Sequence, residues 1–356
     1  MQTLRIGMSA LAFGAMIAGP VAAQETLKLT VATGHPEVFL WVKHIKETFI
    51  PTLEAELAKT GEVTVDWTEA YGGTLVKLGA EAQSMQDGLI DFGHAMGVFD
   101  PANMGILNMT YAMPFGPTDP VLVTKAAEHA LMSAEGFLDQ LADVTGVVYI
   151  GGGIAIDGYN IASTKPLRTR ADMAGVKLSG AGPNLSWLQG TDAVGVQGSY
   201  VSFYNDLKTG VADGMIGWIT ANAPAKIWEV APYYNKVDFG AMYVGGLGVS
   251  QSRWDSFSDS TKEAFKVAAQ AYQDAYFAEQ AARIDAATQA MLDGGGEIVE
   301  FDEAERVAWI NELPNPTTAW SQAAAARGEP VEEILSAYVS FLEEAGFTFP
   351  RNYLEE

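Results

Sequence analysis

The stretch "GVVYIGGGIAIDGYN" (residues 146–160) decides how the chain is organised, because an apolar run ends there in three consecutive glycines. A dinucleotide-binding turn would need Gly-x-Gly-x-x-Gly at the start of a helix. Gly151 and Gly153 fit the first two positions, but Ile156 occupies the third. The following residues alternate like a strand and include Gly158, so the helix N-terminus that a pyrophosphate requires is missing. The glycines favour a strand that crosses between two lobes and bends there, with a nucleotide site as the alternative.

The N-terminus has the pattern of a secretory signal peptide. Arg5 gives a short basic start, and the apolar stretch at 6–19 is too short to span a bilayer. Small residues follow up to Ala23, which predicts cleavage of residues 1–23 near Ala23 and a mature chain that begins at about Gln24. No cysteine follows the small residues, so a lipid anchor is not indicated. The sequence therefore predicts export to the periplasm.

The composition is strongly acidic. The chain has 44 acidic and 21 basic residues and a formal charge of −23, which becomes more negative when Arg5 is removed. Such a charge repels nucleic acid and anionic membrane surfaces, so neither is an expected partner, and an anionic ligand would need a local basic group. Solubility in a salty medium explains the charge equally well. The chain has no cysteine, which excludes disulfides, thiolate catalysis and cysteine zinc sites.

Strands and helices alternate along the chain, which predicts an α/β fold whose functional edge lies at strand ends. Apolar periodicity predicts strands at 26–34, 62–73, 89–96, 154–164 and 243–251, and helices at 37–61 and 76–88. A short helix and then a strand are predicted at 202–218, a long helix at 259–293, and a helical tail at 303–345 that is interrupted at "LPNPTT". The length suits two lobes better than one.

No catalytic or metal site is indicated, and no cofactor is expected. The four histidines (His35, His44, His94 and His129) form neither His-x-x-x-His nor His-x-His, and no Gly-x-Ser-x-Gly elbow occurs. His44 and His129 lie in predicted helices and are interpreted as surface or packing residues. His35 and His94 each follow a strand, so they are candidates to face a cleft, although a capping or core role is the simpler interpretation.

Five segments occur in an order and spacing that resemble a known family over nearly the whole mature chain. They are "SMQDGLIDFGH" (84–94), "PFGPTDP" (114–120), "STKPLRTRADMAGVKLSG" (163–180), "SFYNDLKTGVADG" (202–214) and "IWEVAPYY" (227–234). Each segment alone is a weak signal, but together they resemble the periplasmic solute-binding subunits of tripartite ATP-independent periplasmic (TRAP) transporters, the DctP-type receptors.

The resemblance implies a periplasmic-binding-protein-like fold of two lobes, each a sheet flanked by helices, joined by crossing strands and one long helix. It places residues 24–150 plus about 237–275 in lobe 1, and residues 151–236 plus about 276–356 in lobe 2. It also implies a monomeric receptor, not an enzyme, that closes on a small solute and delivers it to the small and large membrane subunits of the transporter. A binding protein of another transporter or of a sensor system is the alternative, and an exported enzyme is a further one.

One position departs from the family pattern. In the family, the strand after "AGVK" presents an arginine that pairs with the solute's carboxylate through two hydrogen bonds. Ser179 stands at this position, and a hydroxyl cannot replace a guanidinium fork. Either another basic residue takes over, with Lys177 on the same face of the strand, or the solute is not held there as a carboxylate. Arg168 and Arg170 precede this strand and are interpreted as surface residues.

The resemblance also suggests which residues contact the solute. Ser179 and Trp218 are the first candidates because of their places in the motifs. The other candidates are Asp157, Tyr159, Asn184, Trp187, Tyr204, Asn222, His35, Trp41, Tyr71 and His94. Ordinary core packing is the competing interpretation for each aromatic residue. If several line the cleft, they favour a ring or an onium group. An organic acid, a zwitterionic betaine-like osmolyte, an aromatic compound and a polar neutral solute all remain open.

Overall fold

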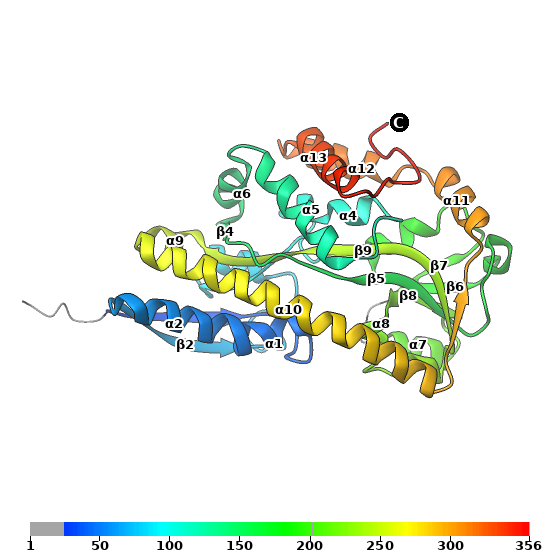
Figure 1. The fold of residues 1–356 in the computed structure, drawn as a ribbon, viewed down its shortest axis with the longest axis horizontal. Helices are drawn as coiled ribbons and strands as arrows, with labels where there is room; N and C mark the ends of the chain where they lie inside the picture. The colour runs from blue at the N-terminus through cyan, green and yellow to red at the C-terminus, as the bar shows by residue number, and fades with distance from the viewer. Residues whose placement is uncertain (1–24, 199, 201, 356) are drawn as a thin grey trace, which may run out of the picture.

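The computed structural model describes residues 25–198, 200 and 202–355, so the predicted signal peptide lies outside the described residues. The fold is α/β, as predicted, with one ten-stranded sheet formed by the described part of the chain. Within these ranges, no helix combines the length and the apolar character needed to cross a bilayer. Figure 1 shows helices on both sides of the central strands, with α5, α12 and α13 above them and α2 and α10 below.

The strand order in the sheet is β2-β1-β3-β9-β5-β8-β6-β7, and β4 and β10 both pair with β9. The strands are β1 (Glu25–Ala32), β2 (Val63–Ala70), β3 (Phe92–Met96), β4 (Val147–Tyr149), β5 (Ile154–Ser163), β6 (Lys177–Gly180), β7 (Val194–Gln197), β8 (Gly214–Trp218), β9 (Tyr233–Ser250) and β10 (Glu297–Glu300).

The helices agree in large part with the predicted pattern. They are α1 (Leu40–His44), α2 (Ile50–Thr60), α3 (Glu81–Gln86), α4 (Met109–Ala112), α5 (Pro120–Ser133), α6 (Phe137–Thr145), α7 (Phe203–Lys208), α8 (Ile219–Asn222), α9 (Gln251–Ser256), α10 (Asp259–Asp293), α11 (Glu303–Glu312), α12 (Pro316–Ala326) and α13 (Val331–Glu344). The predicted long helix is α10, and the predicted break in the tail separates α11 from α12. The helix expected at 76–88 begins only at Glu81, because Gly79 adopts a left-handed φ of +83°.

The two longest strands, β5 and β9, connect the two halves of the sheet (Figure 1). β9 pairs antiparallel with β3 and β4 near its C-terminal end, and it pairs parallel with β10 near its N-terminal end. β5 pairs antiparallel with both β9 and β8, and its register with β9 shifts three times. The half built on β1–β3 is therefore joined to the half built on β6–β8 through these two strands. The predicted lobe boundaries stay a prediction.

The glycine run Gly151–Gly153 carries the chain from β4 to β5, so it precedes a strand and not a helix. The Gly153 amide donates to Glu128 Oε1 at 2.9 Å, and Gln273 Nε2 donates to the Gly153 carbonyl at 2.7 Å. The hydroxyls of Tyr149 and Tyr243 lie 2.7 Å apart, and Tyr149 donates to the same Glu128 oxygen at 3.0 Å. A Cβ at residue 153 would lie 2.5 Å from Glu128 Oε1 and 2.7 Å from Tyr243 Oη. Glycine is therefore needed here for close approach of polar groups.

Helix α10 is 35 residues long and contacts both halves of the molecule. The Ser258 hydroxyl accepts a hydrogen bond from the Thr261 amide at 3.2 Å and so caps its first turn. Tyr272 Oη donates to the carbonyl of Trp41 in α1 at 3.0 Å, and Gln280 Nε2 donates to the carbonyl of Ala155 in β5 at 3.1 Å. One rigid helix thus fixes the segment around Trp41 relative to the crossing strand.

Replacing Gly153 by alanine tests the crowding at this junction. We expect Gly153→Ala to lower the free energy of unfolding by about 2–3 kcal/mol, because the methyl group displaces Glu128 from buried partners. Urea unfolding followed by circular dichroism measures the change. Gly182→Ala is the matched control, because nothing lies within 4 Å of its Cβ, and it should change the stability by less than about 0.5 kcal/mol. Equal stabilities of the two variants would contradict the conclusion that residue 153 must be glycine.

Candidate functional site

A cavity of about 340 Å³ is lined by both halves of the molecule. This volume falls in the range of small-molecule sites. The segments after β1 and β3 form one wall, and β5, β8 and the segments after β6 and β7 form the other. The lining residues are Gly34, His35, Pro36, Phe39, Trp41, Leu78, Met96, Val98, Phe99, Tyr111, Ile156, Tyr159, Ala181, Asn184, Tyr200, Phe203, Ile216, Trp218 and Val244.

Aromatic rings dominate the first wall. Phe39 and Trp41 stack with ring centroids 4.4 Å apart and an interplanar angle of 14°. The His35 ring meets the edges or faces of Phe39, Trp41 and Phe99 at 4.9–5.2 Å in T-shaped contacts. Such contacts hold each ring in one orientation, so this wall is largely preformed.

The second wall is placed by strand register. Tyr159 in β5 pairs directly with Trp218 in β8, and their ring centroids lie 5.0 Å apart. The Tyr159 hydroxyl lies 3.2 Å from the hydroxyl of Tyr111, which comes from α4 in the other half. The sequence therefore brings a tyrosine and a tryptophan together at the cavity through a single cross-strand pair.

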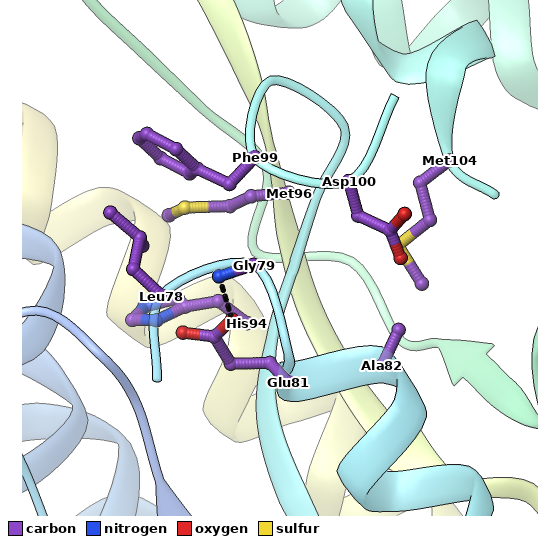
Figure 2. Close-up of a pocket in the computed structure, with 9 residues that line it drawn as sticks. All are labelled: Leu78, Gly79, Glu81, Ala82, His94, Met96, Phe99, Asp100 and Met104. Atoms are coloured by element: carbon purple, nitrogen blue, oxygen red, sulfur yellow. Dashed lines mark hydrogen bonds between the residues drawn. The ribbon is translucent and has the colours of Figure 1, made fainter. Parts of the chain in front are cut away.

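Glu81 holds together the two segments that form the rim of the first wall. Its Oε1 accepts from the Gly34 amide at 2.8 Å and its Oε2 accepts from the Gly79 amide at 2.7 Å. Figure 2 shows the second of these bonds, and Leu78 and Phe99 line the same small void as Glu81. Burial raises the pKa of Glu81, although these hydrogen bonds oppose the shift. Glu81 thus fixes the positions of His35 and Leu78 through their backbone neighbours.

The two histidines near the first wall carry no charge at neutral pH. Burial lowers the pKa of His35 to about 4, and burial together with the neighbouring His35 lowers the pKa of His94 to about 3. The His94 ring nitrogens lie 3.3 Å from Thr33 Oγ1 and from the Trp41 carbonyl oxygen, so this residue supports the wall from behind. Neither histidine supplies a positive charge to a solute.

Five of the residues expected to contact a solute line this cavity together. They are His35, Trp41, Tyr159, Asn184 and Trp218. His94 lies behind the wall, where it lines a void of about 10 Å³ (Figure 2).

The other expected residues do not line the cavity, and their contacts are structural. Trp187 is fully buried and donates from Nε1 to the Tyr111 carbonyl at 2.9 Å, which makes it part of the core. Tyr71 donates to Glu69 at 2.8 Å and Tyr204 donates to Glu229 at 3.0 Å. The sequence patterns around these three residues predict strands and helices, but they do not predict on which face of each element the side chain lies. Asn222 is buried in α8.

Ser179 is fully buried in β6 and does not line the cavity, and its hydroxyl has no hydrogen-bond partner among the described residues. It packs against the Cα of Gly198 so closely that a Cβ there would not fit. Lys177 donates from Nζ to the Gly210 carbonyl at 2.7 Å and does not line the cavity either. Arg168 and Arg170 pair with glutamates. None of these basic residues lines the cavity.

Asp157 lies in β5 beside the cavity and caps α8. Its carboxylate accepts from the Thr220 hydroxyl at 2.5 Å and from the Thr220 amide at 3.2 Å. Burial raises the pKa of Asp157 to about 6, although these hydrogen bonds oppose the shift. Asp157 is 3% exposed, and it supports the segment after Trp218 without lining the cavity.

Several aromatic residues of the walls were not predicted from the sequence. They are Phe39, Phe99, Tyr111, Tyr200 and Phe203. Phe39 precedes Trp41 by two residues at the start of a predicted helix, and Phe99 follows a predicted strand. Their positions at the ends of these elements were the signal that could have placed them at the cavity. Tyr111 carried no signal, because its approach to Tyr159 depends on a contact between segments that are far apart in the sequence.

Replacing Asp157 by asparagine tests its buried state. Because the pKa is raised in the folded protein, the proton is bound more tightly there than in the unfolded chain. The resulting stability is present below about pH 4 and is lost as the pH rises toward 6. We expect wild type to lose on the order of 2 kcal/mol from this group between pH 4 and 7, and Asp157→Asn to lose none of it. Urea unfolding at both pH values checks this against Asp285→Asn, an exposed control. An unchanged pH dependence in Asp157→Asn would contradict the assignment.

Comparisons with known proteins agree with the fold. The family model described as "Bacterial extracellular solute-binding protein, family 7" (DctP) matches residues 41–322. A curated solute-binding protein from Chromohalobacter salexigens is 29% identical over 174 residues, which are 48% of this chain and 50% of the relative. The chain therefore matches about half the length of that curated relative.

Solved structures of similar fold include three periplasmic receptors. A TRAP solute-binding protein from Desulfovibrio salexigens has a TM-score of 0.75 at 16% identity, with 92% of this chain and 98% of that chain covered. One from Chromohalobacter salexigens, solved with bound D-glucuronate, has a TM-score of 0.69 at 19% identity, with 88% and 99% covered. A Bordetella pertussis receptor that binds pyroglutamic acid has a TM-score of 0.71 at 16% identity, with 88% and 99% covered.

These likenesses show the same two-lobed fold, and the family match covers most of the chain. Family members and structural neighbours are solute-binding receptors and not enzymes. The chain belongs to the DctP family, family 7 of the bacterial extracellular solute-binding proteins.

Proposed function

We propose that this protein is a periplasmic receptor that captures one small organic solute between its two halves and delivers it to the small and large membrane subunits of a TRAP transporter. The observation that carries the proposal is the cavity of about 340 Å³ whose walls come from both halves. A solute that contacts both walls stabilises the arrangement in which they face each other, so binding is coupled to closure. The receptor acts as a monomer that is exported by its signal peptide and cleaved near Ala23.

The solute contacts are assigned to the five expected residues that line the cavity: His35, Trp41, Tyr159, Asn184 and Trp218. Tyr159 and Trp218 lie on the second wall, and His35 and Trp41 lie on the first. Asn184 supplies an amide at the segment after β6. The site is non-standard because Ser179 replaces the arginine and no described lysine or arginine lines the cavity in its place.

The two solved relatives named above with ligands bind organic acids, D-glucuronate in one case and pyroglutamic acid in the other. Solutes of that size fit a cavity of this volume. The solute of this receptor is therefore taken to be a small organic compound, either an acid held in an unusual way or a zwitterionic, aromatic or neutral molecule.

A ligand screen tests the receptor function. The mature chain from Gln24 would be unfolded, stripped of ligand and refolded, and its melting temperature measured with dicarboxylates, sulfonates, aromatic acids, betaines, ectoines and neutral aromatic compounds. A ligand at a hundred times its Kd adds about 2.7 kcal/mol, which raises the melting temperature by several degrees. We expect one compound class to give such a shift without turnover. Conversion of any of these compounds to a product would contradict the assignment.

Trp218→Leu tests whether binding uses this cavity. We expect it to weaken the best compound of the screen at least tenfold, because a large ring of the second wall is lost. Isothermal titration calorimetry measures the affinity. Trp254→Leu is the matched control, since Trp254 is also half-buried but packs on Phe257 and Phe265 outside the cavity. If both variants bind like wild type, the solute binds elsewhere.

A further inference from the structure

We propose that the solute is an uncharged, ring-bearing molecule, and that this receptor discriminates against carboxylates and cations. This inference rests on the proposed function, because it names the solute class of the same site. It is carried by the absence of formal charge from the described walls of the cavity, together with their aromatic character.

No described lining residue carries a formal charge at neutral pH. The walls hold no lysine, arginine, aspartate or glutamate, and the imidazole of His35 is neutral because burial lowers its pKa to about 4. A carboxylate that enters such a cavity loses its hydration and gains no ion pair. A cation that enters the cavity also loses its hydration. Ring faces attract it, but no described carboxylate lines the cavity to pair with it.

Basic groups near the cavity are bound to other partners. Arg283 lines a neighbouring pocket of about 30 Å³, and its Nε and Nη2 donate to Glu279 Oε1 at 3.0 and 2.8 Å. Lys43 donates to both oxygens of the same Glu279 at 2.8 and 2.7 Å. Lys77, next to the lining residue Leu78, is exposed and donates to a backbone carbonyl at 2.8 Å. Each of these basic groups is thus already hydrogen-bonded to an acceptor of the protein, and none of the three lines the cavity.

The size and walls of the cavity favour a ring system. Its volume is more than twice that of an apolar cavity of about 150 Å³ that binds benzene. Phe39, Trp41, Tyr159 and Trp218 supply large flat surfaces on both walls. A bicyclic solute therefore fits the space and can stack on rings from both halves.

Neutral hydrogen-bonding groups are available for the solute's polar end. Among the described residues, Trp41 Nε1 and Asn184 Oδ1 are buried without a partner. The first is a donor and the second an acceptor, and both belong to side chains that line the cavity. A carboxamide or a hydroxyl can satisfy both kinds of group, whereas a carboxylate can only accept. Unpartnered buried groups are unfavourable, so a neutral polar end is favoured.

The test compares probes that share one ring and differ in charge. Naphthaleneacetamide, naphthaleneacetate and naphthylethylamine would be titrated into the refolded mature protein at pH 7, together with the phenyl analogues of each. We expect the amide to bind at least tenfold more tightly than the acetate and the amine in at least one ring series. An acetate or amine that binds as tightly as its amide overturns the proposal, and so does a failure of both amides to bind.

The results that overturn the uncharged solute class can be distinguished from a failure of the receptor function. Tight binding of an acetate supports the solute-binding function and rejects only the proposal that the solute is uncharged. Absence of binding by all six probes and by every compound of the earlier screen rejects both the receptor function and the uncharged solute class.

A designed cation tests the charge argument directly. Ala181 is exposed and lines the cavity, so Ala181→Arg adds a guanidinium at its edge without opening the core. We expect naphthaleneacetate to bind this variant at least tenfold more tightly than wild type, with no gain for the amide. Ala171→Arg, at an exposed position outside the cavity, is the matched control and should leave both affinities within twofold. If Ala181→Arg gains no affinity for the acetate, the missing cation is not what discriminates.

Discussion

The antiparallel pairing of β5 with β9 is the constraint on which the rest of the molecule depends. These strands are the main connection within the sheet between the half that carries His35 and Trp41 and the half that carries Trp218. Their junction with β4 is held by Glu128, which accepts hydrogen bonds from the Gly153 amide and from Tyr149 while Gln273 of α10 donates to it. Because the register of β5 with β8 places Tyr159 beside Trp218, the strand that joins the halves also builds the second wall of the cavity.

The walls of the cavity differ in charge from the chain as a whole. The chain is strongly acidic, yet the described walls of the cavity carry no formal charge. The buried carboxylates nearby are used for structure, since Glu81 joins two loops of the first wall and Asp157 caps α8. Recognition is therefore assigned to ring surfaces and neutral hydrogen-bonding groups, which are effective only when closure excludes water.

The fold followed from the sequence more completely than the site did. Periodicity predicted α10 and the tail helices because their apolar spacing persists over many residues. The strand-like alternation after the glycine run predicted a strand there and not a helix. Ser179 was predicted to face the solute from its place in a motif, but its side chain lies against Gly198, and no pattern in β6 reveals which face is buried. Tyr111 escaped prediction because its role depends on the approach of α4 to β5, a contact that local sequence does not encode.

A crystal structure of the mature protein, purified from its native periplasm without refolding, tests the central claim most directly. We predict density for an uncharged, ring-bearing solute between Trp41 and Trp218, in contact with both halves and with no lysine or arginine side chain within hydrogen-bond distance. A carboxylate solute paired with a lysine or arginine, or a solute bound outside this cavity, would contradict it.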